Sequence, residues 1–148
     1  MKPKVVLIIQ ARMGSTRLPG KPLADIAGKP MIQHVWERVS EVLPTFVATD
    51  DERIAQVVEA AGGMAIMTSP NCVNGTQRVT EALHILAEQG QNLPGIVLNI
   101  QGDEPFIEPE QLREVAAGFA SGAPILTLIK KITDTETLFN SNTPKVVC

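Results

Sequence analysis

Short apolar runs alternate with segments of helical period along this chain. The predicted strands are Val5–Ala11, Thr45–Thr49, Ala65–Thr68, Ile96–Gln101, Ile125–Lys130 and Lys145–Val147. Apolar residues recur at helical spacing in the segments between them, which predicts helices near Pro30–Leu43, Glu52–Ala61, Thr76–Gln89 and Pro109–Phe119. This alternation is typical of an α/β fold, with a mostly parallel sheet and helices on both of its faces.

The bulk composition is that of one soluble globular domain. The chain has 148 residues, of which 44% are apolar and 20% are charged. We expect no membrane association, because no apolar run approaches the roughly 20 residues of a membrane span and the amino terminus lacks a signal-peptide pattern. The two cysteines, Cys72 and Cys148, have no metal-ligand spacing, so we expect free thiols and a cytoplasmic location.

The carboxyl end carries a strand-like run that is not followed by a helix or turn. PKVV begins at Pro144 and the sequence stops at Cys148. A domain that ends as a strand begins usually has more chain to come, so we expect a truncated fold. A final strand that closes a sheet edge unaided is the alternative.

A basic loop follows the first predicted strand. Residues 8–23 read IIQARMGSTRLPGKPL, and they place three cations and two hydroxyls after a buried apolar run, at Arg12, Arg17, Lys21, Ser15 and Thr16. Cations, hydroxyls and backbone N–H groups at the carboxyl end of a parallel strand form a receptacle for a polyphosphate. The alternative is a solvated basic turn between a strand and a helix.

This loop matches neither of two common phosphate-binding motifs. A Walker A motif needs four residues between its glycines and a Ser or Thr after its Lys. Gly14 and Gly20 have five residues between them, and Lys21 is followed by Pro22. The dinucleotide fingerprint G-x-G-x-x-G is also absent from the sequence.

The charge distribution argues against nucleic-acid binding. The net charge is −3, yet residues 1–30 carry +5 and the remainder carries −8. Duplex nucleic acid requires an extended basic face, whereas one basic end suits a small anion. Aromatic residues make up 3% of the chain, with no tyrosine, so platforms for stacking single-stranded bases are not expected either.

A second polar segment, NIQGDEPF at residues 99–106, follows the fourth predicted strand. Its carboxylates Asp103 and Glu104 are suited to hold Mg²⁺ against substrate phosphates, because Mg²⁺ commonly takes one or two carboxylates plus phosphate oxygens. The alternative is a Gly-Asp turn in which Pro105 stops the strand. A basic loop at the same sheet edge favours the metal interpretation.

Two further segments read as helix starts. Asn74 and Gln77, in NCVNGTQR at residues 71–78, resemble a capping box. Arg78 lies in the first turn, where the helix dipole disfavours a cation, so it is a candidate ligand contact. Asp50 and Asp51 precede another helix, and capping explains them better than metal binding does.

Four segments of the chain resemble the 3-deoxy-manno-octulosonate (KDO) cytidylyltransferase family. They are QARMGSTRLPGKPLADIAGKPMIQHV, VATDDERIAQVVEAAGG, NGTQRVTEAL and VLNIQGDEPFI, and FNSNTPKVV near the end also fits. The first segment is shared in part with related nucleotidyl- and glycosyltransferases. QGDEP together with NGTQR narrows the resemblance toward KDO rather than sialic acid. The resemblance implies a Rossmann-like nucleotide-diphospho-sugar transferase fold.

The resemblance also implies a reaction and roles for individual residues. The anomeric hydroxyl of KDO, an acidic eight-carbon sugar, attacks the α-phosphorus of CTP, which gives CMP-KDO for lipopolysaccharide and releases pyrophosphate. The implied catalytic residues are Lys21, Arg12 and Asp103, with Asp103 as the Mg²⁺ ligand. The phosphates would be bound by Arg12, Ser15 and Lys21, with Arg17 supporting the loop. The nucleoside side of the pocket would be formed by Gln10, Ala11, Gly75, Thr76, Arg78 and Gln101.

Some features depart from the family pattern. Gln10 stands where the sugar-specific enzymes often have Pro, and Asn74 and Gln77 replace the commoner Ser and Glu. Family members have roughly 250 residues, one domain in size. We therefore expect residues 1–148 to be the nucleotide-binding part of one cytidylyltransferase domain.

The part that the resemblance places beyond residue 148 carries a second metal-binding Asp, most KDO contacts and the dimerisation region. We expect a homodimer when full length, and weak CTP binding with poor turnover from this chain alone. The alternatives are a cytidylyltransferase or glycosyltransferase for another sugar, and a non-catalytic nucleotide-binding fragment.

Overall fold

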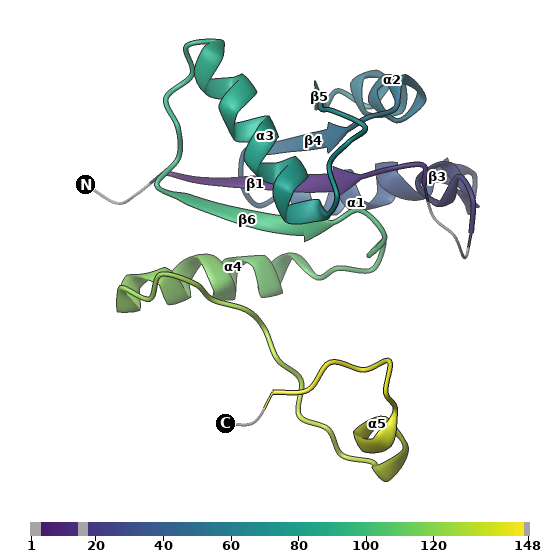
Figure 1. The fold of residues 1–148 in the computed structure, drawn as a ribbon, viewed down its shortest axis with the longest axis vertical. Helices are drawn as coiled ribbons and strands as arrows, with labels where there is room; N and C mark the ends of the chain where they lie inside the picture. The colour runs from purple at the N-terminus through teal and green to yellow at the C-terminus, as the bar shows by residue number, and fades with distance from the viewer. Residues whose placement is uncertain (1–3, 15–17, 147–148) are drawn as a thin grey trace.

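A four-stranded parallel sheet forms the centre of the computed structural model, which describes residues 4–14 and 18–146 (Figure 1). Its strands lie in the order β5-β4-β1-β6. Their bounds are β1 Val5–Ala11, β4 Thr45–Thr49, β5 Met64–Met67 and β6 Ile96–Gln101. The first, second and fourth predicted strands are confirmed with these bounds, and β5 begins and ends one residue earlier than predicted.

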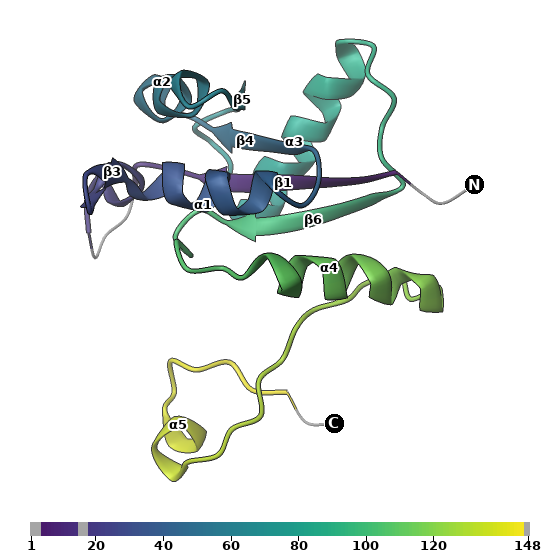
Figure 2. The same ribbon diagram turned by 180° about the vertical axis from the view of Figure 1, so that it is seen from behind.

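Helices cover both faces of the sheet (Figures 1 and 2). On one face lies α3, Gly75–Glu88, and on the other lie α1 Met31–Ser40, α2 Glu52–Ala60 and α4 Pro109–Gly118. The alternation of β1 explains the two layers, because successive side chains of a strand point to opposite faces. Leu7 and Ile9 pack with α1, α2 and α4, whereas Val6 and Ile8 pack with α3.

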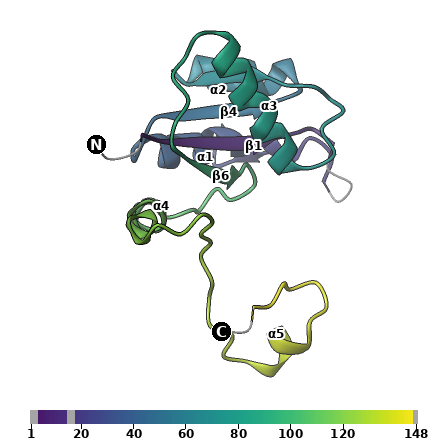
Figure 3. The ribbon, with the colours of Figure 1, turned by 60° about the vertical axis from the view of Figure 1, so that its left-hand side comes forward.

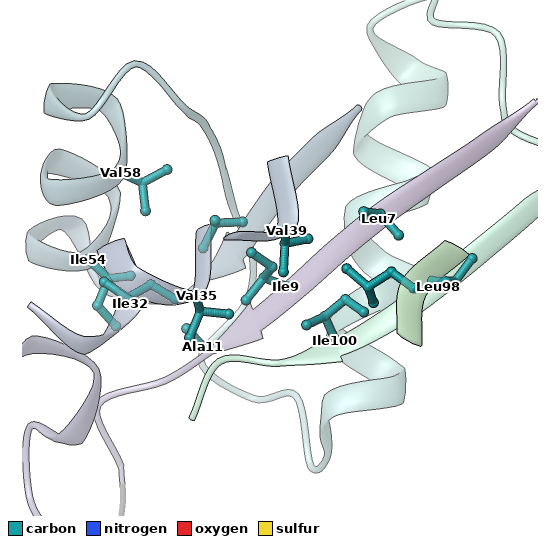
Figure 4. Close-up of a cluster of buried hydrophobic side chains, with 12 residues drawn as sticks. Leu7, Ile9, Ala11, Ile32, Val35, Val39, Ile54, Val58, Leu98 and Ile100 are labelled. Carbon is teal, nitrogen blue, oxygen red and sulfur yellow. The ribbon is translucent and has the colours of Figure 1, made fainter. Parts of the chain in front are cut away.

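The larger core lies between the sheet and the three helices on one side, and Figure 4 shows its side chains meeting there. Ile32, Val35 and Val39 of α1 recur at helical spacing and are fully buried against β1. The start of α2 agrees with the capping expectation at Asp51, whose carboxylate accepts a hydrogen bond from the Arg53 amide at 2.9 Å. The predicted α/β class is therefore confirmed.

The strand order reverses beside β1, and this reversal determines where a ligand can bind. The chain runs outward from β1 through β4 to β5, and α3 then returns it to the other side of β1, where β6 pairs from Val5↔Ile96 to Gln10↔Gln101. Loops diverge at such a switch point and leave a crevice at the carboxyl ends of the strands. In this fold the crevice lies after Ala11 and Gln101, which are the ends of β1 and β6.

The predicted strand Ile125–Lys130 is wrong. This segment leaves α4 as irregular chain and runs away from the sheet (Figure 3). Ile125 is 84% exposed and Ile129 is 59% exposed. A strand requires a partner for its backbone hydrogen bonds, and this segment pairs with no strand of the described sheet. Of the predicted strand Lys145–Val147, the first two residues are irregular and Val147 lies outside the described residues.

A short hairpin and a short helix are among the elements that were not predicted. β2 Asp25–Ile26 and β3 Lys29–Pro30 form a hairpin around Ala27 and Gly28, whose φ angles are 52° and 86°. Two positive φ angles are typical of a type I′ turn. α5, Thr135–Phe139, begins at Asp134, which accepts a hydrogen bond from the Thr137 amide. Elements this short carry no readable periodicity.

Within the described ranges, no helix has the length and apolar character needed to cross a bilayer.

Candidate functional site

A cleft of about 490 Å³ opens at the switch point. Its size is in the range of small-molecule sites. The loop after β1, the loop after β6 and the amino end of α3 enclose it. Its lining residues are Gln10, Ala11, Arg12, Gly14, Leu18, Lys21, Pro22, Val73, Asn74, Gly75, Gln101, Gly102 and Asp103.

Lys21 and Asp103 face each other in this cleft. The Nζ atom of Lys21 donates a hydrogen bond to Oδ2 of Asp103 over 2.7 Å, although 82 residues separate them in the chain. Their side chains are 32% and 50% exposed, so both groups remain accessible to a ligand. The predicted meeting of the basic loop and the QGDEP carboxylate is confirmed.

The chain after β1 folds back so that Lys21 points into the cleft. Gly20 has a φ of 71°, a left-handed conformation that favours glycine, and it begins the short helix η1, Lys21–Leu23. The Gly20 amide donates to the Met13 carbonyl, and the Leu23 amide donates to the Gly20 carbonyl at 2.9 Å. Pro22 in this turn fixes the backbone φ angle.

The amino end of α3 forms the opposite wall. Asn74 precedes the helix, and its Oδ1 accepts a hydrogen bond from the Gln77 amide over 2.8 Å. The Oε1 atom of Gln77 in turn accepts a hydrogen bond from the Val73 amide, and not from the Asn74 amide as in a capping box. The predicted side-chain cap is confirmed, with its second bond shifted by one residue. The positive end of a 14-residue helix at this wall favours an anionic ligand.

Two glycines allow close packing around Gln10 on the floor of the cleft. A Cβ at Gly75 would lie 2.7 Å from Cδ of Gln10, and one at Gly102 would lie 2.6 Å from the Gln10 carbonyl oxygen. The Gln10 amide Nε2 donates to Oε1 of Gln101 over 2.5 Å. The ends of β1, β6 and α3 therefore meet at this residue.

Glu81 holds the loop that leads into the α3 wall. Its Oε1 accepts a hydrogen bond from the Ser69 amide at 2.6 Å, and its Oε2 accepts one from the Cys72 thiol at 3.1 Å. The bond from Cys72, followed by the one from Ser69, lowers the pKa of Glu81. Burial raises the pKa of the Cys72 thiol. The pair therefore consists of a neutral thiol donor and a carboxylate acceptor.

Arg78 lies behind this wall. Its residue is 1% exposed, and its guanidinium donates to Oδ2 of Asp50 at 2.8 Å and to Oγ1 of Thr68 at 2.6 Å. Of the two carboxylates predicted to cap α2, Asp51 does so, and Asp50 instead pairs with Arg78. The pairing was not predicted, because it depends on how α3 packs across the sheet.

The structure gathers most of the predicted site residues. Those that line the cleft are Gln10, Ala11, Arg12, Lys21, Gly75, Gln101 and Asp103. Thr76 and Arg78 lie on α3 and are not among its lining residues. Ser15 and Arg17 lie outside the described residues. The lining residues that were not predicted are Gly14, Leu18, Pro22, Val73, Asn74 and Gly102. The position of Gly102 between Gln101 and Asp103 was a readable signal, and the others follow from the fold.

Among the described residues that line the cleft, one carries a carboxylate, Asp103. Within residues 4–14 and 18–146, no group of three or more His, Cys, Asp or Glu side chains is arranged to hold a metal. A single exposed carboxylate beside a cationic loop fits Mg²⁺ that arrives with phosphates, because Mg²⁺ is usually held by one or two carboxylates together with substrate oxygens.

A parallel α/β sheet with cations, a helix start and a carboxylate at its switch point defines a domain of the Rossmann-like class. Residues 6–148 match the model of the cytidylyltransferase family. The chain belongs to that family.

Relatives with curated names support the same family. A 3-deoxy-manno-octulosonate cytidylyltransferase of Idiomarina loihiensis is 52% identical over 145 residues, which cover 95% of this chain and 56% of the relative. The enzyme of the same name from Cytophaga hutchinsonii is 49% identical over 147 residues, 97% of this chain and 57% of the relative. The chain spans about half the length of the curated relatives that it matches.

Solved structures agree with the fold. One is described as CMP:2-keto-3-deoxy-manno-octonic acid synthetase complexed with CTP. It matches with a TM-score of 0.71 and 45% identity, covering 80% of this chain and 48% of that one. A cytidylyltransferase from Leptospira borgpetersenii matches with a TM-score of 0.67 and 26% identity, covering 82% and 50%. The predicted Rossmann-like transferase fold is confirmed.

Proposed function

We propose that this chain provides the nucleotide-binding half of an enzyme that transfers CMP from CTP to the anomeric hydroxyl of KDO. The observation that supports this most strongly is the Lys21–Asp103 pair, in which an ammonium and a carboxylate lie 2.7 Å apart in the switch-point cleft. The family and the names of its relatives define the substrates proposed.

The phosphates of CTP are assigned to the cationic end of the cleft. Arg12 and Lys21 line that end, and the first turn of α3 adds the positive pole of its helix dipole. Charge-assisted hydrogen bonds from ammonium and guanidinium groups are the strong contacts of phosphate sites. Ser15 and Arg17, in the same loop, complete the proposed phosphate set.

The cytidine is assigned to the uncharged part of the same cleft. Gln10, Gln101 and Gly75 present carboxamide and backbone groups there, which suit the hydrogen-bonding edge of a base and the hydroxyls of a ribose. Thr76 and Arg78 belong to this proposed nucleoside side through their helix, although neither lines the cleft.

Asp103 is the residue proposed to hold Mg²⁺. Its carboxylate is half exposed at the mouth of the cleft, and its present partner is the Lys21 ammonium, which a metal–triphosphate complex can replace. When bound, the ion supplies charge neutralisation at the phosphates and orients them.

The proposed step is an in-line displacement. An oxygen–phosphorus bond forms between the anomeric oxygen of the sugar and the α-phosphorus of CTP, the bond from that phosphorus to pyrophosphate breaks, and the hydroxyl proton passes to solvent or base. Lys21 and Arg12 stabilise the negative charge that develops on the phosphoryl oxygens and on pyrophosphate. Their contribution is positioning and electrostatics, since neither forms a covalent bond to the substrate.

Other parts of the proposal rest on the resemblance and on composition. We include a role in lipopolysaccharide synthesis, a cytoplasmic location and a homodimer of the full-length protein, and we exclude nucleic acid as a partner. The free, buried Cys72 is consistent with a reducing compartment.

Nucleotide binding tests this proposal directly. The melting temperature is measured with CTP, UTP, ATP and GTP in the presence of Mg²⁺, because a ligand that binds the native state at about 100 times its Kd adds about 2.7 kcal/mol of stability. We expect CTP to give the largest shift. With KDO added, we expect slow pyrophosphate release, because the described cleft offers one metal carboxylate. No shift with CTP, or an equal shift with ATP, would refute the proposal.

A further inference from the structure

We infer that Arg78 is a positioning residue, which holds the α3 wall of the cleft through Asp50 and Thr68 instead of contacting the nucleotide. This inference rests on the proposed function, because it assigns a role in CTP binding. It revises the role implied by the family resemblance, in which Arg78 faces the cytidine. Three observations carry it: burial, partners and the place of Arg78 on the helix.

The Arg78 guanidinium is enclosed and already bonded. Its side chain is 2% exposed, whereas the Asp50 carboxylate is 17% exposed. One terminal nitrogen donates to Asp50 and the other to Thr68, at 2.8 and 2.6 Å. Among the described residues, no buried side-chain nitrogen or oxygen lacks a partner. A nucleotide contact would require this pair to break and the guanidinium to move to the cleft.

The two partners tie Arg78 to the ends of neighbouring strands. Asp50 directly follows β4, and Thr68 directly follows β5. Thr68 is itself fixed, because its amide and its hydroxyl both donate to the Thr49 carbonyl, at 2.8 and 3.1 Å. The guanidinium therefore bonds to residues at the carboxyl edge of the sheet, one of which is hydrogen-bonded to β4.

The first turn of α3 connects Arg78 to the cleft. Its amide donates to the Asn74 carbonyl at 3.2 Å, and the cap residue Asn74 and the first α3 residue, Gly75, line the cleft. Gly75 packs against Gln10 so closely that an added Cβ would overlap it. A small shift of the helix start would therefore change the contact between this wall and the cleft floor.

The ion pair with Asp50 fixes the position of the Arg78 side chain against the sheet. Replacing a buried pair with apolar residues is often neutral for stability, and a defined geometry is one documented reason to keep such a pair. The planar guanidinium bonds Asp50 and Thr68 in fixed directions, which Lys would not reproduce. The consequence is specific: loss of Asp50 should disturb the cleft as much as loss of Arg78.

A double-mutant cycle on CTP affinity tests this inference. We measure the Kd for CTP by calorimetry with Mg²⁺ for the wild type, D50N, R78Q and D50N/R78Q. We expect each single variant to weaken binding by about tenfold and the double variant to be no weaker than the worse single one, because residues that act as one unit are non-additive. Direct contact predicts that R78Q weakens binding while D50N resembles the wild type, and this result would overturn the inference.

The matched control is R53Q. Arg53, in the first turn of α2, pairs with Asp51, the residue next to Asp50, at 2.7 Å. The Arg53 side chain is 65% exposed, so its loss should leave the CTP affinity unchanged. If R78Q does not fold, D50N and R78K are measured instead. R78K keeps the charge but not both bonds, so we expect an affinity between those of the wild type and D50N. A wild-type affinity in both variants would contradict the inference.

Amide hydrogen exchange separates this inference from the proposed function. The Gln77 amide is protected by its bond to Asn74 in the wall. In D50N we expect it to exchange faster, while amides of β1 keep their wild-type rates. If the wild type does not bind CTP, the proposed function fails, and unchanged Gln77 protection in D50N would separately show that Arg78 does not position the wall.

Discussion

Replacing Lys21 with methionine should separate ligand binding from folding. The Lys21–Asp103 pair is 32% and 50% exposed, and exposed pairs contribute about 0–1 kcal/mol to stability. For a chain of this size 1 kcal/mol corresponds to about 2–4 °C, so the melting temperature of K21M should fall by less than about 4 °C. A hydrogen bond to a charged group contributes about 1.5–3 kcal/mol, so the Kd for CTP should rise by about 10- to 150-fold.

The assay is calorimetric titration of CTP in Mg²⁺ buffer, paired with melting of the unliganded protein. K29M is the matched control, because Lys29 makes a similar pair with Glu37 at 2.9 Å, with side chains 47% and 36% exposed, and lines none of the cleft. K29M should bind CTP as the wild type does. A K21M affinity within about threefold of the wild type would refute the assignment of Lys21 to the phosphates.

The remaining predictions concern backbone packing and helix capping. G102A should lower stability by about 1–3 kcal/mol, because its Cβ would lie 2.6 Å from the Gln10 backbone oxygen. The atoms nearest to a Cβ at Gly75 belong to the Gln10 side chain, which can move, so G75A should mainly weaken CTP binding. Equal melting temperatures for the two variants would contradict this. D51A should cost about 1 kcal/mol of unfolding free energy at pH 7, as loss of a helix cap does. The hydrogen bond from the Arg53 side chain, followed by the one from the Arg53 amide, lowers the pKa of Asp51 in the folded protein. The stabilisation by Asp51 is therefore fully present above the pKa of about 3.9 that an unfolded Asp has, and it is lost as the pH falls through the lower pKa of the folded state. Denaturation midpoints of the wild type and D51A should therefore converge at low pH, and a constant gap would count against the capping role.

The sheet and its covering helices could be predicted because their signals are local. β1 is a continuous apolar run, and α1 has a stripe at helical spacing, so each element was readable within a few residues. Ile125–Lys130 shows the limit of this reasoning. Its pattern is strand-like, but pairing depends on a neighbouring strand, and no pairing involves it in the described chain. A hydrophobic pattern cannot report whether such a partner is present.

The site was predictable where sheet topology decides proximity. Lys21 and Asp103 follow β1 and β6, and the carboxyl ends of two paired parallel strands necessarily meet. The Arg78–Asp50 pair and the Cys72–Glu81 bond were missed, because both depend on how α3 packs across the sheet. The unusual cation in the first turn of α3 was a readable signal, but it did not identify the carboxylate that pairs with it.

The affinity of D103N for CTP, with Mg²⁺ and with EDTA, tests most directly whether the cleft holds a metal–triphosphate complex. The wild type should bind CTP more tightly with Mg²⁺ than with EDTA. In D103N the two affinities should converge, and its affinity in EDTA should equal or exceed that of the wild type, because a carboxylate that repels the phosphates has been removed. A D103N variant that keeps the full Mg²⁺ enhancement would contradict the account.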